Sequence, residues 1–189
     1  MPKPFDSIER DSATVFVLDR ELRILYCNEA WDRFAESNGG VALMRPRIYE
    51  MCVLDVVPEP LKDWYRSAYL KVFKTGRQWV HEYECSSSTV YRLFRMTALQ
   101  RPREDFILVT NFLLEERPHG DERPITPPDA AVYDGDKIAM CSLCRRTRGR
   151  RRRRWDWVPA YVERPPAGLA YGVCESCQKK LVVTTGIGD

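Results

Sequence analysis

Apolar and polar residues alternate in short blocks along residues 1–110. Residues 14–18 and 22–26 are rich in β-branched and aromatic side chains, and Asp19-Arg20-Glu21 separates them, which predicts two strands joined by a tight turn. Further strands are predicted at 78–85 and 89–98. Residues 106–110 form a continuous apolar run, which is typical of a strand that is covered on both faces.

Two helices are predicted between the second and third strands. Asn28 occupies the N-cap position of the first helix, apolar residues follow at helical spacing, and Gly39-Gly40 ends it. The second helix is predicted at 61–74, where apolar residues recur every three or four positions before Gly76. This order of elements predicts an α+β fold, with helices packed on one face of a five-stranded antiparallel sheet.

The composition changes near residue 118. Residues 118–136 contain four prolines among Gly, Asp and Glu, which is typical of a semi-rigid linker. We therefore expect a sheet-and-helix domain at 1–117, a linker at 118–136 and a small cysteine-containing module at 137–189. No apolar run approaches the ~20 residues that cross a bilayer, and the polar first residues are unlike a signal peptide. A cytoplasmic protein without a membrane partner is expected.

The spacing of the seven cysteines indicates metal binding. Cys27, Cys52 and Cys85 are isolated, and we expect them to act as small apolar side chains. The other four form two Cys-x-x-Cys pairs, which are Cys141 with Cys144 and Cys174 with Cys177. An odd number of cysteines in a chain without a secretory signal argues against a disulfide framework.

Two facing Cys-x-x-Cys turns supply four thiolates in the tetrahedral geometry that Zn²⁺ prefers. No open ligand position is evident, so a structural site is predicted, and a module of this size depends on its metal for folding. Iron in the same cage, an iron–sulfur cluster and four reduced thiols are the alternatives. Four aromatic residues are expected to pack around the pairs, with stacking on nucleic-acid bases as the alternative: Trp155, Trp157, Tyr161 and Tyr171.

The net charge of +3 is unevenly distributed. Eight of the ten residues at 145–154 are arginines: Arg145, Arg146, Arg148, Arg150, Arg151, Arg152, Arg153 and Arg154. Such a run is either a solvated surface loop or a contact surface for nucleic-acid phosphates or an acidic partner, because guanidinium groups pair with phosphate oxygens.

The first part resembles a PAS domain of the bacterial sensor type. The likeness rests on an Asn-x-x-Trp-x-x-Phe-Ala segment followed by Asn-Gly, and on a Glu-Tyr-x-Cys strand followed by an Arg/Phe-rich strand. In this chain the matching residues are Asn28, Trp31, Phe34, Ala35, Asn38, Gly39, Glu82, Tyr83, Cys85, Arg92, Phe94 and Met96.

The resemblance implies a cavity between the sheet and the helices that holds a small molecule. Candidate lining residues are Trp79, His81, Tyr83 and Phe94. Haem and flavin are not expected, because the helix at 61–74 contains no histidine and the neighbours of Cys52 do not match the flavin-binding motif. His81 is also compatible with a hydrogen-bonded position in the core.

The tail is similar to a zinc-ribbon-like segment that follows sensor or receiver domains in bacterial signalling proteins. The match includes Cys-Ser-x-Cys with two following basic residues, then Trp155, Val158, Tyr161 and the second cysteine pair. Departures are the arginine run in place of an acidic turn, Tyr171 in place of histidine, and Glu175 in place of proline.

Catalysis is not expected. The chain has two histidines, and four residues along a strand place His81 about 13 Å from Cys85, beyond the reach of proton transfer. No phosphate-binding glycine loop or nucleophile elbow occurs.

The preferred hypothesis is a cytoplasmic signalling protein that senses through its PAS-like domain and contacts a protein partner through a zinc module. PAS domains commonly dimerise, so the resemblance implies a homodimer, which apolar residues on both faces of the strand at 89–98 permit. The alternative is a nucleic-acid-binding regulator that uses the arginine-rich module. A third reading is a PAS-like dimerisation scaffold with a filled core and no ligand.

Overall fold

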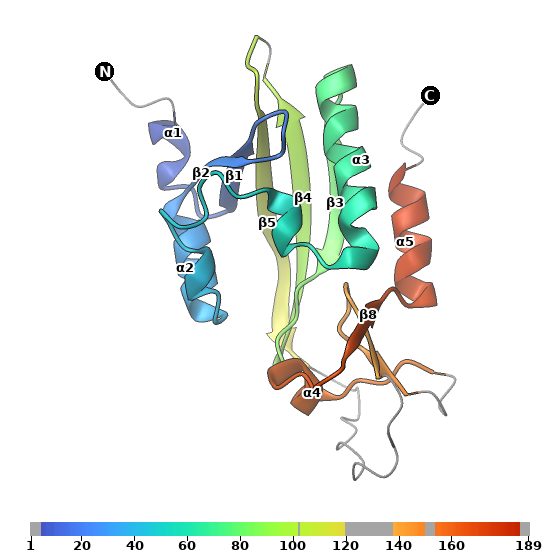
Figure 1. Cartoon of the computed structure of the whole chain (residues 1–189). Coiled ribbons are helices and arrows are strands. Elements are labelled where there is room, and N and C mark those ends of the chain that lie inside the picture. Colours follow the sequence, from blue (N-terminus) through green and yellow to red (C-terminus); the bar gives the residue numbers. More distant parts are fainter. Residues whose placement is uncertain (1–4, 102, 120–137, 150–153, 186–189) are drawn as a thin grey trace. The chain divides into compact units, whose positions relative to one another are not determined.

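The computed structural model describes residues 5–101, 103–119, 138–149 and 154–185 of the 189-residue chain. Five strands form its main sheet in the order β2-β1-β5-β4-β3, as Figure 1 shows. These strands are β1 (Thr14–Leu18), β2 (Ile24–Cys27), β3 (Trp79–Glu84), β4 (Val90–Gln100) and β5 (Ile107–Pro118). The predicted α+β fold with a five-stranded antiparallel sheet is confirmed.

β1 is a central strand of this sheet. It pairs with β2 through Phe16 and Cys27, and with β5 from Thr14 opposite Asn111 to Leu18 opposite Ile107, in both cases antiparallel. Val17, Leu18, Ile107 and Val109 are fully buried. The continuous apolar run at 106–110 therefore marks a covered strand, as predicted.

The helices within residues 1–113 lie between β2 and β3 in the chain, apart from a single turn, α1 (Asp6–Glu9), that precedes the sheet. They are α2 (Glu29–Ser37), α3 (Glu59–Thr75) and two 3₁₀ turns, η1 (Val41–Leu43) and η2 (Val53–Val56). α3 buries Leu61, Tyr65, Tyr69 and Val72, which recur at helical spacing along one face. Tyr69 Oη lies 3.5 Å from Met96 Sδ on β4, so this face packs on the sheet.

α3 begins two residues earlier than the sequence predicts, because Pro58 takes the N-cap position and Pro60 is tolerated in the first turn. It ends at Gly76, whose φ of 65° is the left-handed conformation that glycine adopts readily. The C-terminal boundary therefore agrees with the prediction to within one residue.

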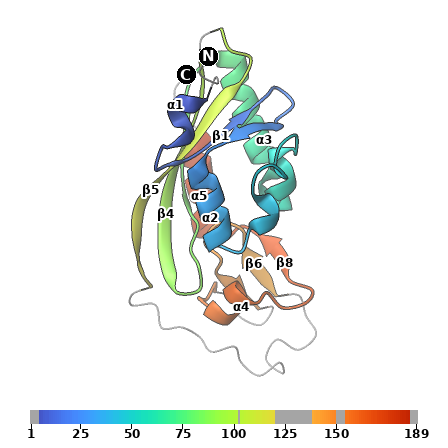
Figure 2. The ribbon, with the colours of Figure 1, turned by 90° about the vertical axis from the view of Figure 1, so that its left-hand side faces the viewer.

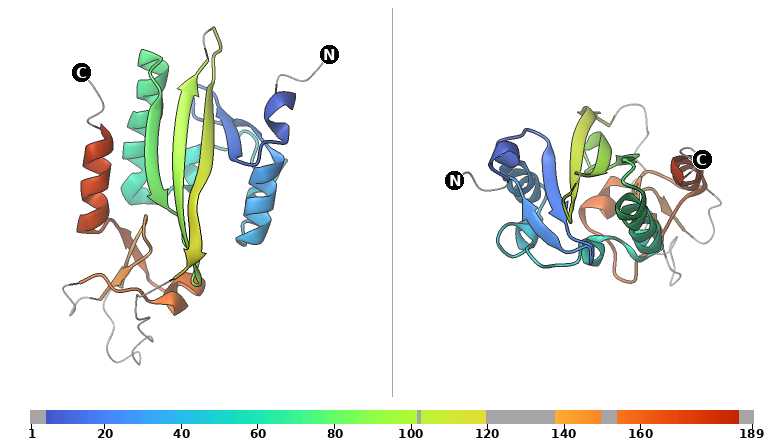
Figure 3. Two further views of the ribbon diagram at one scale, coloured as in Figure 1. Left: turned by 180° about the vertical axis from the view of Figure 1, so that it is seen from behind. Right: turned by 90° about the horizontal axis from the view of Figure 1, so that it is seen from above.

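β5 is longer than predicted. The apolar run ends at Thr110, but the strand continues to Pro118 beside β4, as Figures 2 and 3 show from two sides. Its register with β1 ends at Asn111. Pairing with β4 sustains the extra residues, and an apolar run alone does not report such pairing. The remainder of the predicted linker, at 120–136, lies outside the described residues.

The chain divides into two compact units. One comprises residues 1–82 and 95–113, and the other comprises 83–94 and 114–189. The second unit therefore contains the end of the β3–β4 hairpin, the end of β5 and the cysteine module. The division at 117 and 137 that composition suggests stays a prediction.

The cysteine module has its own small sheet in the order β7-β6-β8. Its elements are β6 (Ala139–Cys141), β7 (Thr147–Arg148), α4 (Pro159–Glu163), β8 (Ala170–Gly172) and α5 (Glu175–Thr185). Met140, Trp157 and Val162 form a buried cluster, with Tyr161 and Leu169 packed against it. Further buried apolar residues of the module are Leu143, Val158 and Leu181. This core is still small for a stable module, which favours an additional stabilising element. Within the described ranges of the whole chain, no helix combines the length and the apolar character that a bilayer span requires.

Candidate functional site: a four-cysteine metal centre

A tight turn at the end of β6 holds the first cysteine pair. The Cys141 carbonyl accepts a hydrogen bond from the Arg145 N–H at 2.9 Å, and the Cys141 N–H donates to the Arg146 carbonyl at 2.8 Å. Arg145 has a φ of 58°, in the left-handed region. This reversal directs the chain back toward the Cys141 backbone and keeps the side chains of Cys141 and Cys144 within one turn.

The second pair lies where β8 passes into α5. Cys174 precedes the helix, and Cys177 follows in its first turn, where the Gln178 N–H donates to the Cys174 carbonyl at 2.8 Å. β6 and β8 are parallel neighbours, with Cys141 opposite Gly172, and the Ser142 N–H donates to the Gly172 carbonyl at 2.8 Å. Two segments about 30 residues apart thereby lie side by side, with their C-terminal ends at the same edge of the small sheet.

The four sulfur atoms converge. All four cysteines are buried, and their Sγ atoms lie within 4.8 Å of one another. Cys144 Sγ and Cys174 Sγ are 3.7 Å apart, and the Cys174 N–H donates to Cys141 Sγ at 3.4 Å. A tetrahedral centre with metal–sulfur bonds of about 2.3 Å places its sulfurs about 3.8 Å apart. The four predicted ligand residues therefore form a donor set that fits a metal ion.

The thiols influence one another's ionisation strongly. Hydrogen bonds from Cys144 and Cys177 lower the pKa of Cys141, so its sulfur is the preferred thiolate. The hydrogen bond to Cys141 raises the pKa of Cys144 to about 12 and also raises the pKa of Cys177. A divalent cation would lower the pKa of every cysteine that it binds, because it stabilises the thiolate form of each.

Described arginines of the cysteine module form ion pairs with acidic side chains. Ion pairs join Arg148 to Glu175 at 3.3 Å and Arg154 to Asp156 at 2.6 Å. The Arg148 guanidinium also lies 5.2 Å from the Trp155 ring centroid, and Trp155 Nε1–H donates to Glu175 at 2.8 Å. Arg150–Arg153 lie outside the described residues, so nucleic-acid contact by the full run stays a prediction.

Two of the four aromatic residues belong to the buried cluster of Met140 and Val162, whereas packing around the cysteine pairs themselves stays a prediction. Trp157 is 5% exposed and Tyr161 packs against the same cluster. Trp155 is partly exposed and contacts polar neighbours at the start of α5. Tyr171 is 51% exposed, so the prediction is wrong for this residue. Tyr171 is the middle residue of β8, and both of its neighbours in the strand, Ala170 and Gly172, are less exposed than it is.

The four candidate pocket residues fall into two aromatic groups. Trp79 and His81 are buried on β3 and stack with ring centroids 5.9 Å apart and an interplanar angle of 4°. Tyr83 and Phe94 form a second stacked pair with centroids 5.7 Å apart. The first pair lies in the unit that contains α3 and the second in the unit that contains the cysteine module.

α3 completes the first group. Trp64 lies with its ring centroid 4.7 Å from His81 and 5.2 Å from Trp79, and Tyr65 lies 5.8 Å from Trp79. Trp64 Nε1 is buried and has no hydrogen-bond partner among the described residues. Helical periodicity in the sequence places Trp64 on the packed face, but periodicity cannot reveal that its ring nitrogen is unsatisfied.

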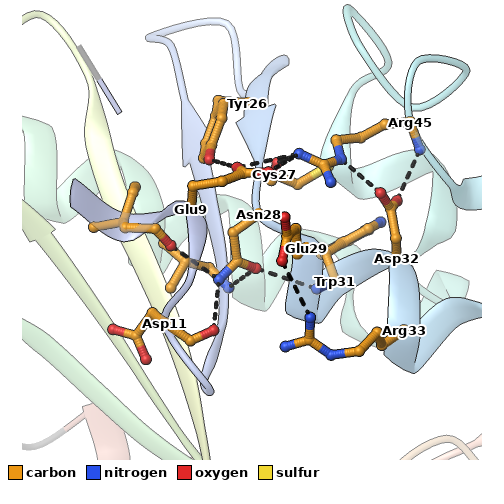
Figure 4. Close-up of polar contacts among 12 residues, drawn as sticks. Glu9, Asp11, Tyr26, Cys27, Asn28, Glu29, Trp31, Asp32, Arg33 and Arg45 are labelled. Carbon is orange, nitrogen blue, oxygen red and sulfur yellow. Dashed lines mark hydrogen bonds and ion pairs between the residues drawn. The ribbon is translucent and has the colours of Figure 1, made fainter. Parts of the chain in front are cut away.

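A polar network fastens α1 to the sheet and to α2 (Figure 4). Arg45 forms ion pairs with Glu9 at 2.8 Å and with Asp32 at 2.6 Å, and it donates to the Cys27 carbonyl at 3.1 Å. The Tyr26 hydroxyl also donates to Glu9. Sequence reasoning missed this network, since nothing in the spacing of these residues reports that they meet.

Comparisons with known proteins give only structural matches. No protein family matches the sequence, and no curated protein matches it. The fold is similar to the PAS domain of the quorum-sensing receptor RpfR from Cronobacter turicensis, solved in complex with BDSF, at 15% identity and a TM-score of 0.44 over 57% of this chain and 99% of that one. The PAS domain of nitrogen regulation protein NR(II) from Vibrio parahaemolyticus is 15% identical with a TM-score of 0.37, over 60% of this chain and 100% of that one. A PAS domain from a two-component sensor histidine kinase is 18% identical with a TM-score of 0.39, over 57% of this chain and 89% of that one.

Proposed function

We propose that the chain is a cytoplasmic signal-transduction protein with a small-molecule sensing domain and a zinc-stabilised module that contacts a protein partner. The observation that carries the proposal is the convergence of four buried cysteine sulfurs within 4.8 Å. Four thiolates in a closed tetrahedron suit a structural Zn²⁺ ion, which has no redox chemistry of its own. The role assigned to the module is therefore binding rather than catalysis.

The small size of the module supports a structural role for the metal, because a module this short buries too little apolar surface to be stable by itself. In such modules the free energy of metal binding is largely the free energy of folding. Zn²⁺ held by Cys141, Cys144, Cys174 and Cys177 would give the module a fixed surface for a signalling partner.

The sensing role rests on the resemblance to PAS domains and on the aromatic group between α3 and β3. The buried and unsatisfied Trp64 Nε1–H supports a ligand that presents a hydrogen-bond acceptor there, since unpaired buried donors are costly. Trp79 and His81 supply ring faces beside it. The proposed ligand is a small, largely apolar molecule with one acceptor group.

The proposed homodimer would use the second half of β5. On β4, Phe94, Met96 and Ala98 are buried, whereas Phe112, Leu113 and Leu114 of β5 are 44%, 49% and 42% exposed. The expected apolar surface on residues 89–98 is thus smaller than the sequence indicated. Exposed apolar residues in a row favour a contact between copies.

Native mass spectrometry of the full chain purified without added metal tests the zinc assignment. The expected mass includes one zinc ion per chain. The Cys144→Ser variant should lose it, and the matched control Cys85→Ser should retain it, because Cys85 is a cysteine outside the sulfur cluster. A stoichiometric iron mass or a metal-free wild-type protein would refute the zinc assignment.

A further inference from the structure

The end of the β3–β4 hairpin belongs to the same compact unit as the cysteine module. The hairpin is closed by the Cys85 N–H, which donates to the Arg92 carbonyl at 3.0 Å, and by the Ser87 N–H, which donates to the Val90 carbonyl at 2.9 Å. The backbone hydrogen bonds of residues 83–94 are therefore those of an ordinary β-hairpin. Glu84, however, also contacts a residue more than 50 positions further along the chain.

The first contact is an ion pair between the hairpin and the first cysteine turn. Arg146 lies 3.7 Å from Glu84, and their side chains are only 29% and 13% exposed. The same Arg146 provides the carbonyl that accepts from the Cys141 N–H at 2.8 Å. The position of this guanidinium therefore depends on the cysteine turn being formed.

The second contact is a ring contact between the end of β5 and the core of the module. The His119 ring lies 4.1 Å from the Trp157 ring, centroid to centroid, and Trp157 is part of the buried cluster with Met140. His119 is itself attached to the hairpin: its N–H donates to the Thr89 carbonyl at 3.2 Å, and its Nε2 lies 3.0 Å from the Ser87 carbonyl oxygen.

From these two contacts we infer that metal binding at the four cysteines stabilises the hairpin end at 83–94 and the end of β5. The inference rests on the proposed metal site. Both contacts need a folded module, since one uses the cysteine turn and the other uses a core tryptophan. If the metal folds the module, then it also forms the surface against which Glu84 and His119 pack. Linkage requires the reverse effect as well, so a formed hairpin end strengthens metal binding.

Through these contacts, metal binding would affect a strand that continues into the sensing domain. β3 runs from Trp79 to Glu84, so the candidate ligand contacts and the ion pair with Arg146 lie on one strand of six residues. The four-cysteine centre would then stabilise the strand that contains Trp79 and His81. Its role would extend beyond holding a separate module together.

Hydrogen–deuterium exchange on the full chain, loaded with one Zn²⁺ or stripped with a chelator, tests the inference, with native mass spectrometry reporting the metal content of each sample. Chelation should accelerate amide exchange at 83–94 and 114–119 by about tenfold or more, while peptides from 14–27 stay unchanged as an internal reference. In the loaded protein, Glu84→Gln should accelerate exchange at 83–94 by a few-fold with zinc retained. Glu82→Gln is the matched control, because Glu82 pairs with Arg95 inside the sheet at 2.6 Å.

Chelation that accelerates exchange at 139–177 and leaves 83–94 unchanged would overturn the inference and leave the zinc assignment intact. Equal effects of the Glu84 and Glu82 substitutions on residues 83–94 would also overturn it. A protein that binds no zinc is recognised separately by its mass, and that result would refute the proposed metal site together with the inference.

Discussion

The side-chain amide of Asn28 joins the first strand to the first long helix: its Oδ1 accepts a hydrogen bond from the Val15 N–H at 3.0 Å and another from the Trp31 N–H at 3.1 Å. The Nδ2 group of the same side chain donates to the carbonyls of Ile8, Asp11 and Ala13. Asn28 is fully buried. One side chain thus caps α2, accepts a hydrogen bond from the backbone of β1 and binds the segment that follows α1 (Figure 4).

Replacing Asn28 with alanine should therefore destabilise the protein more than the loss of a simple helix cap. It leaves the buried Val15 N–H without its partner and removes the α2 cap, and we expect a loss of about 2–4 kcal/mol in the free energy of unfolding. Urea unfolding measures it. Asn38→Ala is the control, because Asn38 makes an exposed hydrogen bond to the Phe34 carbonyl, and it should cost no more than about 1 kcal/mol. Equal losses for the two variants would contradict this role of Asn28.

The network at Glu9 predicts a loss of stability in acid. Burial raises the pKa of Glu9, but hydrogen bonds from Tyr26 and Arg45 outweigh burial, so the net pKa is lowered. A carboxyl whose folded pKa lies below its unfolded value, near about 4.3, adds stability above that unfolded value and loses it as the pH falls through the folded pKa. Glu9→Gln should therefore lower stability at neutral pH by about 1–2 kcal/mol and reduce the acid sensitivity.

Unfolding curves at neutral pH and below pH ~4 provide the measurement for Glu9. Glu29→Gln is the matched control, since Glu29 pairs with Arg33 at 3.5 Å with both side chains at least half exposed, and such pairs contribute about 0–1 kcal/mol. If the two variants show the same pH dependence, the Glu9–Arg45 contact does not stabilise the folded state.

The sequence is informative where one local feature determines the structure. Apolar periodicity located α3 to within two residues, and the two Cys-x-x-Cys spacings identified the residues whose sulfurs converge. Asn28 was recognised as a helix cap, but its bonds to Val15 and Ala13 depend on tertiary packing. Such contacts have no local pattern.

The contacts of the hairpin end show the same limit more clearly. Glu84 and Arg146 are 62 positions apart, and each looks like an ordinary charged surface residue in the sequence. The length of β5 beyond Thr110 was missed for a related reason, because pairing with β4 sustains a strand after its apolar run ends. Long-range pairing therefore accounts for most of what sequence patterns could not predict.

The aromatic group between α3 and β3 predicts different outcomes for two tryptophan substitutions. Trp79→Ala should cost about 3–5 kcal/mol of unfolding free energy, because Trp79 is 9% exposed and its removal leaves a cavity. Trp64→Phe should cost no more than about 1 kcal/mol, because it retains a ring and removes an unsatisfied N–H donor. The same Trp64→Phe protein should carry less co-purified small molecule by native mass spectrometry. Undiminished cargo would exclude Trp64 Nε1 as a ligand contact.

Because the cysteine thiols hydrogen-bond one another, we expect metal binding to release protons and the metal affinity to fall in acid. The Cys141 hydrogen bond holds the pKa of Cys144 at about 12 and also raises the pKa of Cys177, so both thiols retain their protons at neutral pH. A metal ion binds thiolates, so each ion must displace at least these two protons, and affinity should fall roughly a hundredfold per pH unit on acidification. Calorimetric titration of chelator-treated protein with Zn²⁺ in buffers of different ionisation enthalpy counts the released protons. Binding without proton release would mean that these sulfurs are not the ligands, whereas Cys85→Ser should leave the count unchanged.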